Sequence, residues 1–245
     1  MKYKLSVVSY LNTIPFIYGL KQYGLDKKLD ISLDIPSACA EKLLSKKVDI
    51  GLVPIVVLKQ LEDAQIISDY CIGANGAVDT VCFFSDVPFD AVEGILLDYQ
   101  SRTSVELLKI LLKEHWRISP KLIEANENYE TQISGKTAGL IIGDRAFNFQ
   151  DKFKYAYDLS DIWKQMTGLS FVFACWIANK ELDEGFTKEF NNALKFGVEN
   201  IEGAIKSAAD IYSHCKNPQD YLNNNISYLL DEDKRKGMEL FLEKI

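Results

Sequence analysis

The sequence predicts an α/β protein built of two lobes with a cleft between them. Strand-like and helix-like segments alternate over most of the 245 residues, which is typical of βαβ units and a mostly parallel sheet. The N-terminal block of this alternation has only about 85 residues, and a block of that size buries only a small core by itself. We therefore expect the last part of the chain to return and pack on the first block.

The predicted elements follow one another in two α/β blocks. In the first block, a strand leads into a helix that has Pro15 in its first turn. Strands of this block are expected at residues 4–8, 29–35, 48–55, 65–71 and 78–85, with a short helix over 38–47. Strands of the second block are expected at residues 92–99, 120–125 and 138–144, with a helix over 103–116. A strand at 171–178 follows, and from Leu182 to the end the pattern predicts helices only.

This pattern divides the chain into two lobes. Residues 1–86 together with 171–245 form lobe I, and residues 87–170 form the inserted lobe II. Two connections then cross between the lobes, near Asp86–Asp90 and Thr167–Phe171, and such a pair makes a hinge. The cleft between the lobes is the expected ligand site.

The composition limits the partners that the protein binds. The net charge is −7 and no basic stripe is present, which argues against nucleic acid as a partner. The longest apolar runs, such as residues 50–58, are much shorter than a membrane span. The segment MKYKLSVVSYLN enters a strand pattern without the apolar run and cleavage site of a signal peptide. We therefore expect a cytoplasmic protein without a membrane partner, and the sequence gives no indication of its oligomeric state.

Cysteine and histidine residues are too scattered to predict a metal site. The five cysteines are widely spaced in apolar or helical segments, which favours buried free thiols. The two histidines, His115 and His214, occur without a C-x-x-C or H-E-x-x-H pattern, so we predict no metal site. Neither histidine is near a predicted strand end, which disfavours a histidine general base.

The stretch VSYLNTIPF places polar side chains where the first strand passes into a helix. Tyr10, Asn12 and Thr13 crowd this strand end, directly before Pro15. In open α/β sheets, ligands bind at the carboxyl ends of the strands. Asn12 is therefore our first candidate for a functional side chain. The alternative is an asparagine that hydrogen-bonds only its own turn.

The stretch DYQSRTSVELL predicts a helix N-terminus with many hydrogen-bond donors. Thr103 followed by Glu106 fits the T-x-x-E capping box, and Ser101, Arg102 and Ser104 stand around it. A helix N-terminus attracts a carboxylate or a phosphate. The alternative is that the capping box only starts the helix.

The stretch AGLIIGDRA predicts a second corner of the same kind, with Gly143 and Asp144 at the entry to a helix. Asp144 is interpreted either as a helix cap or as a polar group that faces the cleft. Arg145 is predicted to form a surface ion pair, with an anion as its alternative partner. Thr80 lies in the strand-like segment VDTVCFFS, where a β-branched hydroxyl residue is ordinary.

Taken together, these segments resemble the chorismate dehydratase family of menaquinone biosynthesis by the futalosine route. The stretches that match, in family order and across nearly the whole chain, are SYLNTIPF, IPSACAEKLLSKKVDIGLVPI, SRTSVELLKILL, GLIIGDRA, DIWKQMTGLSFVFACW and YLNNNISYLLDEDKRKGMELFLEKI. The family is similar in fold to type II periplasmic binding proteins, which have two α/β lobes about a cleft. This agrees with the division into lobes made above.

The resemblance implies a lyase that removes water from chorismate to give 3-[(1-carboxyvinyl)oxy]benzoate. It implies catalytic roles for Asn12 and Thr80, which stand where the family carries its asparagine and a hydroxyl residue. We expect that the enolpyruvyl carboxylate of the substrate takes the proton, with Asn12 holding this carboxylate and Thr80 or another hydroxyl assisting the departure of water. No cofactor is expected. The expected substrate contacts are Ser37, Pro54, Ser101, Arg102, Thr103, Ser104, Gly143 and Asp144.

Three other functions stay open at the level of sequence. A non-catalytic binder of small carboxylates is one, because a fold does not settle a function. The sibling enzyme that makes dihydroxynaphthoate is another, although we expect a cleft histidine there. A regulatory effector-binding domain is the third, and it is disfavoured because neither end of the sequence carries a DNA-reading helix-turn-helix.

Overall fold

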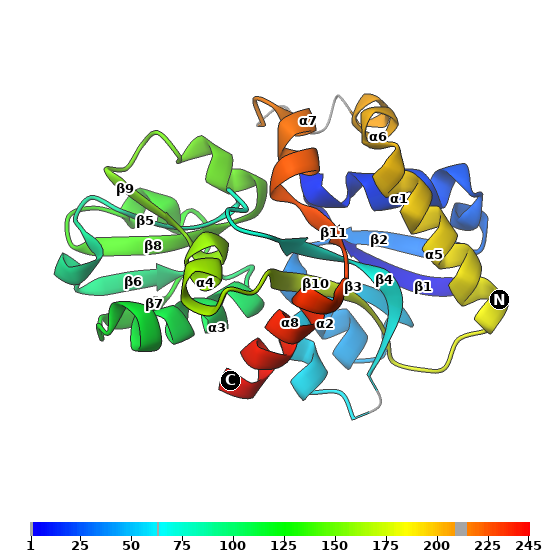
Figure 1. The fold of residues 1–245 in the computed structure, drawn as a ribbon, viewed down its shortest axis with the longest axis horizontal. Helices are drawn as coiled ribbons and strands as arrows, with labels where there is room; N and C mark the ends of the chain where they lie inside the picture. Colours follow the sequence, from blue (N-terminus) through cyan, green and yellow to red (C-terminus); the bar gives the residue numbers. More distant parts are fainter. Residues whose placement is uncertain (1, 63, 209–214) are drawn as a thin grey trace.

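A computed structural model of the chain describes residues 2–62, 64–208 and 215–245, and these residues form two β-sheets that lie beside each other (Figure 1). The first sheet has the order β11 (Ser227–Leu229), β4 (Gln65–Ala74), β10 (Phe171–Ala178), β3 (Ile50–Pro54), β1 (Tyr3–Val8) and β2 (Leu29–Asp34). The second has the order β7 (Lys121–Glu124), β6 (Gly94–Leu97), β8 (Thr137–Ile142), β5 (Val81–Ser85) and β9 (Tyr155–Asp158).

Both sheets are mixed, so the prediction of a mostly parallel sheet is wrong. In the first sheet, β1 pairs in parallel with β2 and β3, whereas β10 runs antiparallel to β3 and β4. In the second sheet, β6 pairs in parallel with β7 and β8, whereas β5 runs antiparallel to β8 and β9. β5 and β10 each begin directly after a passage of the chain from one sheet to the other, whereas β11, which is also antiparallel to its neighbour β4, does not.

Helices cover the faces of the sheets. The α-helices are α1 (Ile14–Gln22), α2 (Pro36–Leu44), α3 (Thr103–Leu111), α4 (Leu159–Thr167), α5 (Glu184–Glu199), α6 (Ile201–Ser207), α7 (Pro218–Asp220) and α8 (Glu232–Lys244). The 3₁₀ turns are η1 (Leu11–Thr13), η2 (Leu25–Lys27), η3 (Ile55–Lys59), η4 (Phe89–Ala91), η6 (Tyr129–Gln132) and η7 (Gly143–Asn148), and the π turns are η5 (Leu112–Trp116) and η8 (Tyr221–Asn225).

The first strand and helix form as the sequence predicts. β1 is a parallel strand whose last four residues are buried, and Pro15 lies in the first turn of α1, where its missing N–H costs nothing. α1 packs closely on α5 because Gly19 faces the backbone of Ala193, and a β-carbon at Gly19 would come within 2.0 Å of that carbonyl oxygen. This close packing fixes the end of β1 and the turn η1 that follows it.

The chain passes between the sheets at points that differ in part from those predicted. It leaves the first sheet after β4 and enters the second at β5, so the first passage covers residues 75–80 and not 86–90. β5 therefore belongs to the second sheet, although the predicted boundary at residue 86 placed it in lobe I. The chain returns between α4 and β10, over residues 168–170. The division into two hinged lobes stays a proposal.

The C-terminal segment returns to the first sheet. β11 pairs antiparallel with β4, and α8 contacts β10 (Figure 1). The prediction of helices only after Leu182 missed β11, and the prediction for the second block missed β9. Both are short strands, of three and four residues, respectively, which carry too few residues for a period of two to be recognised.

Candidate active site

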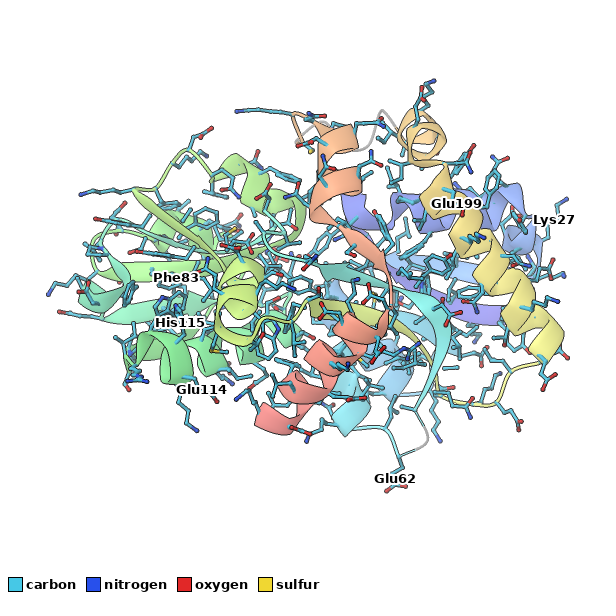
Figure 2. All side chains as sticks on the ribbon, viewed as in Figure 1. Lys27, Glu62, Phe83, Glu114, His115 and Glu199 are labelled. Atoms are coloured by element: carbon cyan, nitrogen blue, oxygen red, sulfur yellow. The ribbon has the colours of Figure 1, made fainter. Side chains whose placement is uncertain are left out.

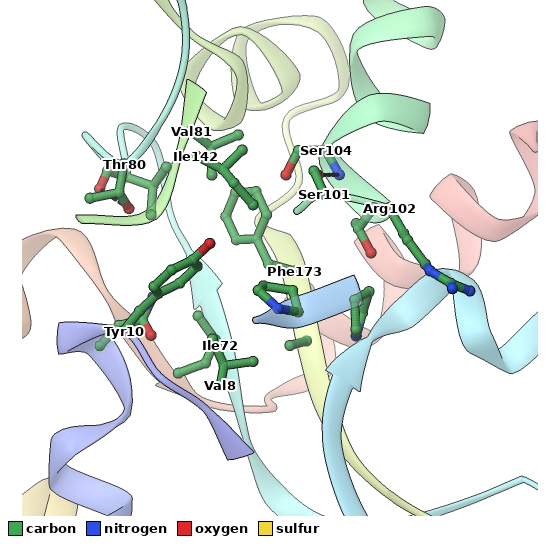
Figure 3. Close-up of a pocket in the computed structure, with 17 residues that line it drawn as sticks. Val8, Tyr10, Ile72, Thr80, Val81, Ser101, Arg102, Ser104, Ile142 and Phe173 are labelled. Carbon is green, nitrogen blue, oxygen red and sulfur yellow. Dashed lines mark hydrogen bonds between the residues drawn. The ribbon is translucent and has the colours of Figure 1, made fainter. Parts of the chain in front are cut away.

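A pocket lies where strand ends of both sheets meet, and it holds about 550 Å³ of space, including the solvent-open space at its mouth. Figure 3 shows Tyr10 and Thr80 on one side and Ser101, Arg102 and Ser104 on the other. The lining residues are Val8, Tyr10, Asn12, Pro36, Pro54, Ile72, Val78, Thr80, Val81, Ser101, Arg102, Thr103, Ser104, Ile142, Gly143, Phe173 and Ala174.

Asn12 lies in the turn η1, and its side chain is not tied to its own turn. The residue is 8% exposed, and its Oδ1 atom is buried without a hydrogen-bond partner among the described residues. The backbone holds it in place, since the hydroxyl of Tyr228 donates to the carbonyl oxygen of Asn12 over 3.0 Å. Thr13 supports the turn, because its hydroxyl donates to the carbonyl oxygens of Val8 and Tyr10. A buried acceptor without a donor is costly, so Oδ1 is poised for a ligand.

Thr80 lies at the end of the passage between the sheets, directly before β5. Its Oγ1 atom is 2.9 Å from the hydroxyl oxygen of Tyr221 and 3.4 Å from the carbonyl oxygen of Val78. Tyr221 begins η8, so the C-terminal segment reaches the pocket from behind. Burial raises the pKa of Tyr221, and hydrogen bonds from Thr80 and Asn12 partly oppose this rise. Thr80 and Asn12 therefore share one neutral tyrosine.

The N-terminus of α3 is capped differently from the prediction. Arg102 stands at the N-cap position without a side-chain cap, and Oγ of Ser101, one residue earlier, accepts from the N–H of Ser104 over 3.2 Å. Thr103 is the first helical residue, and Glu106 pairs with Lys109 over 2.8 Å and not with the cap. The predicted capping box is therefore wrong, because the helix begins at Thr103 and leaves its hydroxyl free for other contacts.

Two groups at the start of α3 are available to a ligand. The Oγ1 atom of Thr103 is buried without a partner among the described residues, and the residue is 3% exposed. The guanidinium of Arg102 likewise forms no hydrogen bond or ion pair within the described part of the chain, and it extends outward from the pocket in Figure 3. A free hydroxyl, a free guanidinium and the helix dipole all favour an anion at this corner.

The corner after β8 looks similar in sequence, but its donors are already used. Gly143 has a φ of +69° and leaves room for Tyr10, since a β-carbon here would come within 2.4 Å of that ring. The N–H of Gly143 donates to the carbonyl oxygen of Thr80 over 2.8 Å. Asp144 does not line the pocket, and its carboxylate accepts from the N–H of Leu11 over 2.9 Å. This geometry does not support the anion-binding role expected of this corner.

A buried ion pair stabilises the wall behind that corner. Arg145 donates from Nη2 to Asp98 over 2.6 Å and from Nη1 to Glu130, so it is not the surface partner predicted. The Asp98 side chain is fully buried and also accepts from the N–H of Ile142 and the hydroxyl of Tyr129. Arg145, attracted to Asp98, has its pKa raised despite burial. The pair is thus structural and turned away from the pocket.

Pro54 lines the pocket, whereas Ser37 does not. The N–H of Ser37 donates to the carbonyl oxygen of Gln100 over 3.1 Å, which joins the start of α2 to the segment before α3. The hydroxyl of Tyr10 donates to the side-chain oxygen of the same Gln100. Ser37 therefore helps to close the two sheets around the pocket and does not face a ligand.

The described residues that line the pocket include no carboxylate, imidazole, thiol or amine. His115 is exposed on η5 and lies in Figure 2 over the second sheet, away from the region between the sheets, and His214 lies outside the described residues. Burial raises the pKa of Tyr10 well above its usual range, so this phenol stays neutral. No group of three His, Cys, Asp or Glu side chains in the described ranges is arranged to hold a metal ion.

Comparison with known proteins identifies the family. A model of the family described as "Menaquinone biosynthesis" matches residues 3–245. The chain belongs to the menaquinone biosynthesis family. The family resemblance that the six sequence stretches indicated is thereby confirmed. A protein from Thermus thermophilus that is named chorismate dehydratase is 28% identical over 264 residues, which cover 99% of this chain and 95% of that protein.

Solved structures agree on the fold of this member of the menaquinone biosynthesis family. Protein AF1704 from Archaeoglobus fulgidus has a TM-score of 0.78 at 15% identity, over 99% of this chain and 96% of that one. The Candida albicans CA3427 gene product, described as having the generic periplasmic binding protein fold, has a TM-score of 0.62 at 11% identity, over 99% and 89%. The predicted fold class, an α/β fold like that of periplasmic binding proteins, is therefore confirmed. No helix in the described ranges is long and apolar enough to cross a membrane.

Sequence reasoning missed two residues that this site depends on. Tyr221 contacts Thr80, and Tyr228 contacts the backbone of Asn12. Both tyrosines lie in YLNNNISYLL, one of the stretches that carry the family resemblance. The stretch itself was the available signal, but its contact with the first strand depends on a pairing across more than 200 residues of chain.

Proposed function

We propose that this protein is a carbon–oxygen lyase that removes water from chorismate and gives 3-[(1-carboxyvinyl)oxy]benzoate for menaquinone biosynthesis. Membership of the menaquinone biosynthesis family over residues 3–245 supports the pathway. The similarity to the Thermus thermophilus protein named chorismate dehydratase supports the reaction. The cytoplasmic location expected from the sequence is part of this proposal.

One observation carries the proposal: the pocket presents buried polar atoms that have no hydrogen-bond partner among the described residues. Oδ1 of Asn12 and Oγ1 of Thr103 lack partners among the described residues, and they come from opposite sheets. Chorismate carries two carboxylates and one ring hydroxyl. The start of α3, with Arg102 and Thr103, suits a carboxylate, and its apolar surroundings, such as Ile72 and Phe173, suit the ring.

The reaction needs little more than orientation and a base. The C–H bond at the ether-bearing ring carbon breaks, and its electron pair forms the new ring double bond. The neighbouring C–O bond breaks, and the hydroxyl leaves as water after it takes up a proton. No electrons are gained or lost overall, and the product ring is aromatic, so positioning contributes most of what an enzyme must supply.

The described part of the pocket wall does not supply a general base. The lining residues that the structure describes carry no carboxylate, imidazole, thiol or amine, and the buried phenol of Tyr10 donates to Gln100. The enolpyruvyl carboxylate of the substrate is the remaining base within reach of that C–H bond. We keep substrate-assisted proton removal as the mechanism of this proposal.

The direct test is to incubate the purified protein with chorismate and to record the mass of the product. We expect conversion to a species lighter by one water with the ultraviolet absorption of a substituted benzoate. Heat-denatured protein is the control for spontaneous decay. Binding of chorismate without any conversion would contradict the proposal and indicate a non-catalytic carboxylate binder.

A further inference from the structure

The first passage of the chain between the sheets, over residues 75–80, ends at the catalytic candidate Thr80. Oδ2 of Asp158 accepts from two consecutive backbone N–H groups of this passage, those of Val78 and Asp79, over 2.9 and 2.7 Å. Asp158 is the last residue of β9, so the contact joins the passage to the second sheet. Hydrogen bonds to a charged acceptor are stronger than those to a neutral one. The chain directly before Thr80 is therefore held firmly in place.

The carboxylate of Asp158 has no cation partner. Its other oxygen, Oδ1, accepts from the N–H groups of Ser160 and Asp161 over 2.9 and 3.1 Å and caps α4. Apart from the thiol of Cys82, at 4.0 Å from Oδ2, the carboxylate is thus held by backbone N–H groups within the described part of the chain. Burial disfavours the charged form of such a group. A serine would cap the helix equally well, so the helix alone does not explain a carboxylate here.

Asp79 has a backbone conformation that needs support from its surroundings. Its φ is +63°, in the left-handed region that is costly for residues other than glycine. The carbonyl oxygen of Asp79 accepts from Nε2 of Gln150 over 2.7 Å, and its carboxylate accepts from Nδ2 of Asn225 over 3.0 Å. Together with the bond from its own N–H to Asp158, these contacts hold the left-handed turn that leads the chain into β5.

This turn sets the position of Thr80. The carbonyl oxygen of Thr80 accepts from the N–H of Gly143 over 2.8 Å, which fixes the residue on the side of β5. Val78 and Thr80, the neighbours of Asp79, both line the pocket and are 1% and 2% exposed. A small displacement of a group that acts on the substrate slows the chemical step strongly. The turn at Asp79 is therefore a point at which a contact outside the pocket influences the reaction.

Resting on the proposed function, we propose that Asp158 is a positioning residue whose carboxylate holds the turn at Asp79, so that the hydroxyl of Thr80 faces the substrate. Asp158 does not line the pocket, and it acts through the backbone of the passage. Its two oxygens have separate roles, since Oδ1 stabilises α4 and Oδ2 stabilises the passage. Loss of the contacts of Oδ2 is expected to lower kcat and to leave the binding of a carboxylate at the start of α3 unchanged.

The charge of Asp158 gives this role a pH dependence. Burial raises the pKa of this carboxyl group to about 6. The titratable groups that face it are Asp79 of the passage, Cys82 of β5 and Asp161 of α4. A proton on either oxygen lies where backbone N–H groups already point, so it disrupts part of these contacts. We therefore expect the kcat of the wild-type protein to fall as the pH is lowered through about 6.

The test replaces Asp158 by a residue that keeps only the helix cap. Asp158→Ser retains one oxygen, which caps α4, and leaves the passage without its carboxylate. We expect kcat for chorismate to fall about tenfold while KM changes less than about twofold, and the fall of kcat between about pH 7 and pH 5 to disappear. The matched control is Asp183→Ala, which removes the carboxylate that caps α5 by accepting from the N–H of Phe186. This control is expected to keep kcat and its pH profile unchanged.

Three outcomes overturn the inference. They are an unchanged kcat in Asp158→Ser, an equal loss of kcat in the control, and a wild-type kcat that stays constant between about pH 7 and pH 5. The last measurement also decides the matter if Asp158→Ser does not fold. If the wild-type protein binds chorismate without converting it, the proposed function fails alone, and amide hydrogen exchange replaces kinetics. Exchange of residues 75–80 is then expected to be about tenfold faster in Asp158→Ser, and equal exchange overturns the inference.

Discussion

The corner at the start of α3 and the corner after β8 have similar sequences but opposite states of their polar groups. At the first corner, the hydroxyl of Thr103 has no partner among the described residues. At the second corner, the N–H of Gly143, the carboxylate of Asp144 and the guanidinium of Arg145 all bind other parts of the chain. Both corners follow a strand and begin a helical turn. The comparison teaches that a ligand binds where polar groups have no hydrogen-bond partner within the folded chain.

The corner after β8, whose polar groups all bind other parts of the chain, is expected to give the largest effect on stability when Asp98, the partner of its Arg145, is replaced. Asp98→Ala removes the buried partner of Arg145, together with acceptors for Tyr129 and the N–H of Ile142. Removing one partner of a buried pair costs about 3–5 kcal/mol, and because Arg145 keeps its pair with Glu130 we expect a cost near the lower end, about 3 kcal/mol. Urea denaturation measures the free energy of unfolding. The control is Glu93→Ala, which breaks the exposed pair with Lys136 and is expected to cost less than about 1 kcal/mol. An equal loss of unfolding free energy in the two variants would contradict a structural role for the pair of Arg145 with Asp98.

A second buried carboxylate, that of Asp158, is expected to make the stability of the protein depend on pH. Burial, with a smaller contribution from Asp79, raises the pKa of Asp158 from 3.8 to about 6, although backbone N–H groups oppose the rise. The folded state therefore binds more protons than the unfolded state between these values, and stability falls as the pH rises. We expect the wild-type protein to lose up to ~3 kcal/mol of unfolding free energy, relative to Asp158→Asn, over this range.

Chemical or thermal denaturation of both proteins at several pH values measures this difference. Because the two proteins share every other titrating group, their difference isolates Asp158. A difference that stays constant from about pH 4 to pH 7 would show that Asp158 has an ordinary pKa.

Substitution of Asn12, which lines the pocket, is expected to affect activity and not stability. Asn12→Ala removes the unpartnered Oδ1 and is expected to lower kcat about 100-fold or more, or about 2.7 kcal/mol in the barrier. The free energy of unfolding should change by less than about 1 kcal/mol, because the side chain contributes little internal bonding. Steady-state kinetics with chorismate and denaturation of the same sample provide both values. A normal rate would refute the role of Asn12.

The smallest expected effects are those of the two hydroxyls at the start of α3, of Ser101 and Thr103. Thr103→Val removes a buried hydroxyl without a partner in the described structure, so we expect unchanged or slightly higher stability and about a tenfold lower kcat/KM. Ser101→Ala removes the hydroxyl that accepts from the N–H of Ser104 in the first turn of α3 and is expected to lower stability by about 1 kcal/mol. If Thr103→Val destabilises the protein and leaves kcat/KM unchanged, the hydroxyl of Thr103 has a structural role and does not bind the substrate.

Local sequence patterns predicted the parts of the fold that local interactions decide. The strand ending at Val8, the helix that begins around Pro15 and the strand over Phe171–Ala178 agree with the structure, because periodicity and proline placement report on a few neighbouring residues. Of the expected site residues, Asn12, Pro54, Thr80, Gly143 and the segment 101–104 line one pocket.

Tertiary contacts decided the rest. Ser101 and Thr103 both present a hydroxyl before an amphipathic run, and only the folded chain shows that the hydroxyl of Ser101 accepts from the first turn of α3. Asp144 binds Leu11 from more than 130 residues away, and Tyr228 binds Asn12 across a still longer separation. A single sequence carries no period or motif for such pairings.

The structure of the protein with bound 3-[(1-carboxyvinyl)oxy]benzoate tests the central claim most directly. The account predicts that a carboxylate of this ligand lies at the start of α3, with an oxygen about 3 Å or less from Oγ1 of Thr103. It also predicts that the bond from Gly143 to Thr80 and the pair of Arg145 with Asp98 stay intact. A carboxylate bound instead by Gly143 or Arg145, with those internal bonds broken, would contradict the account.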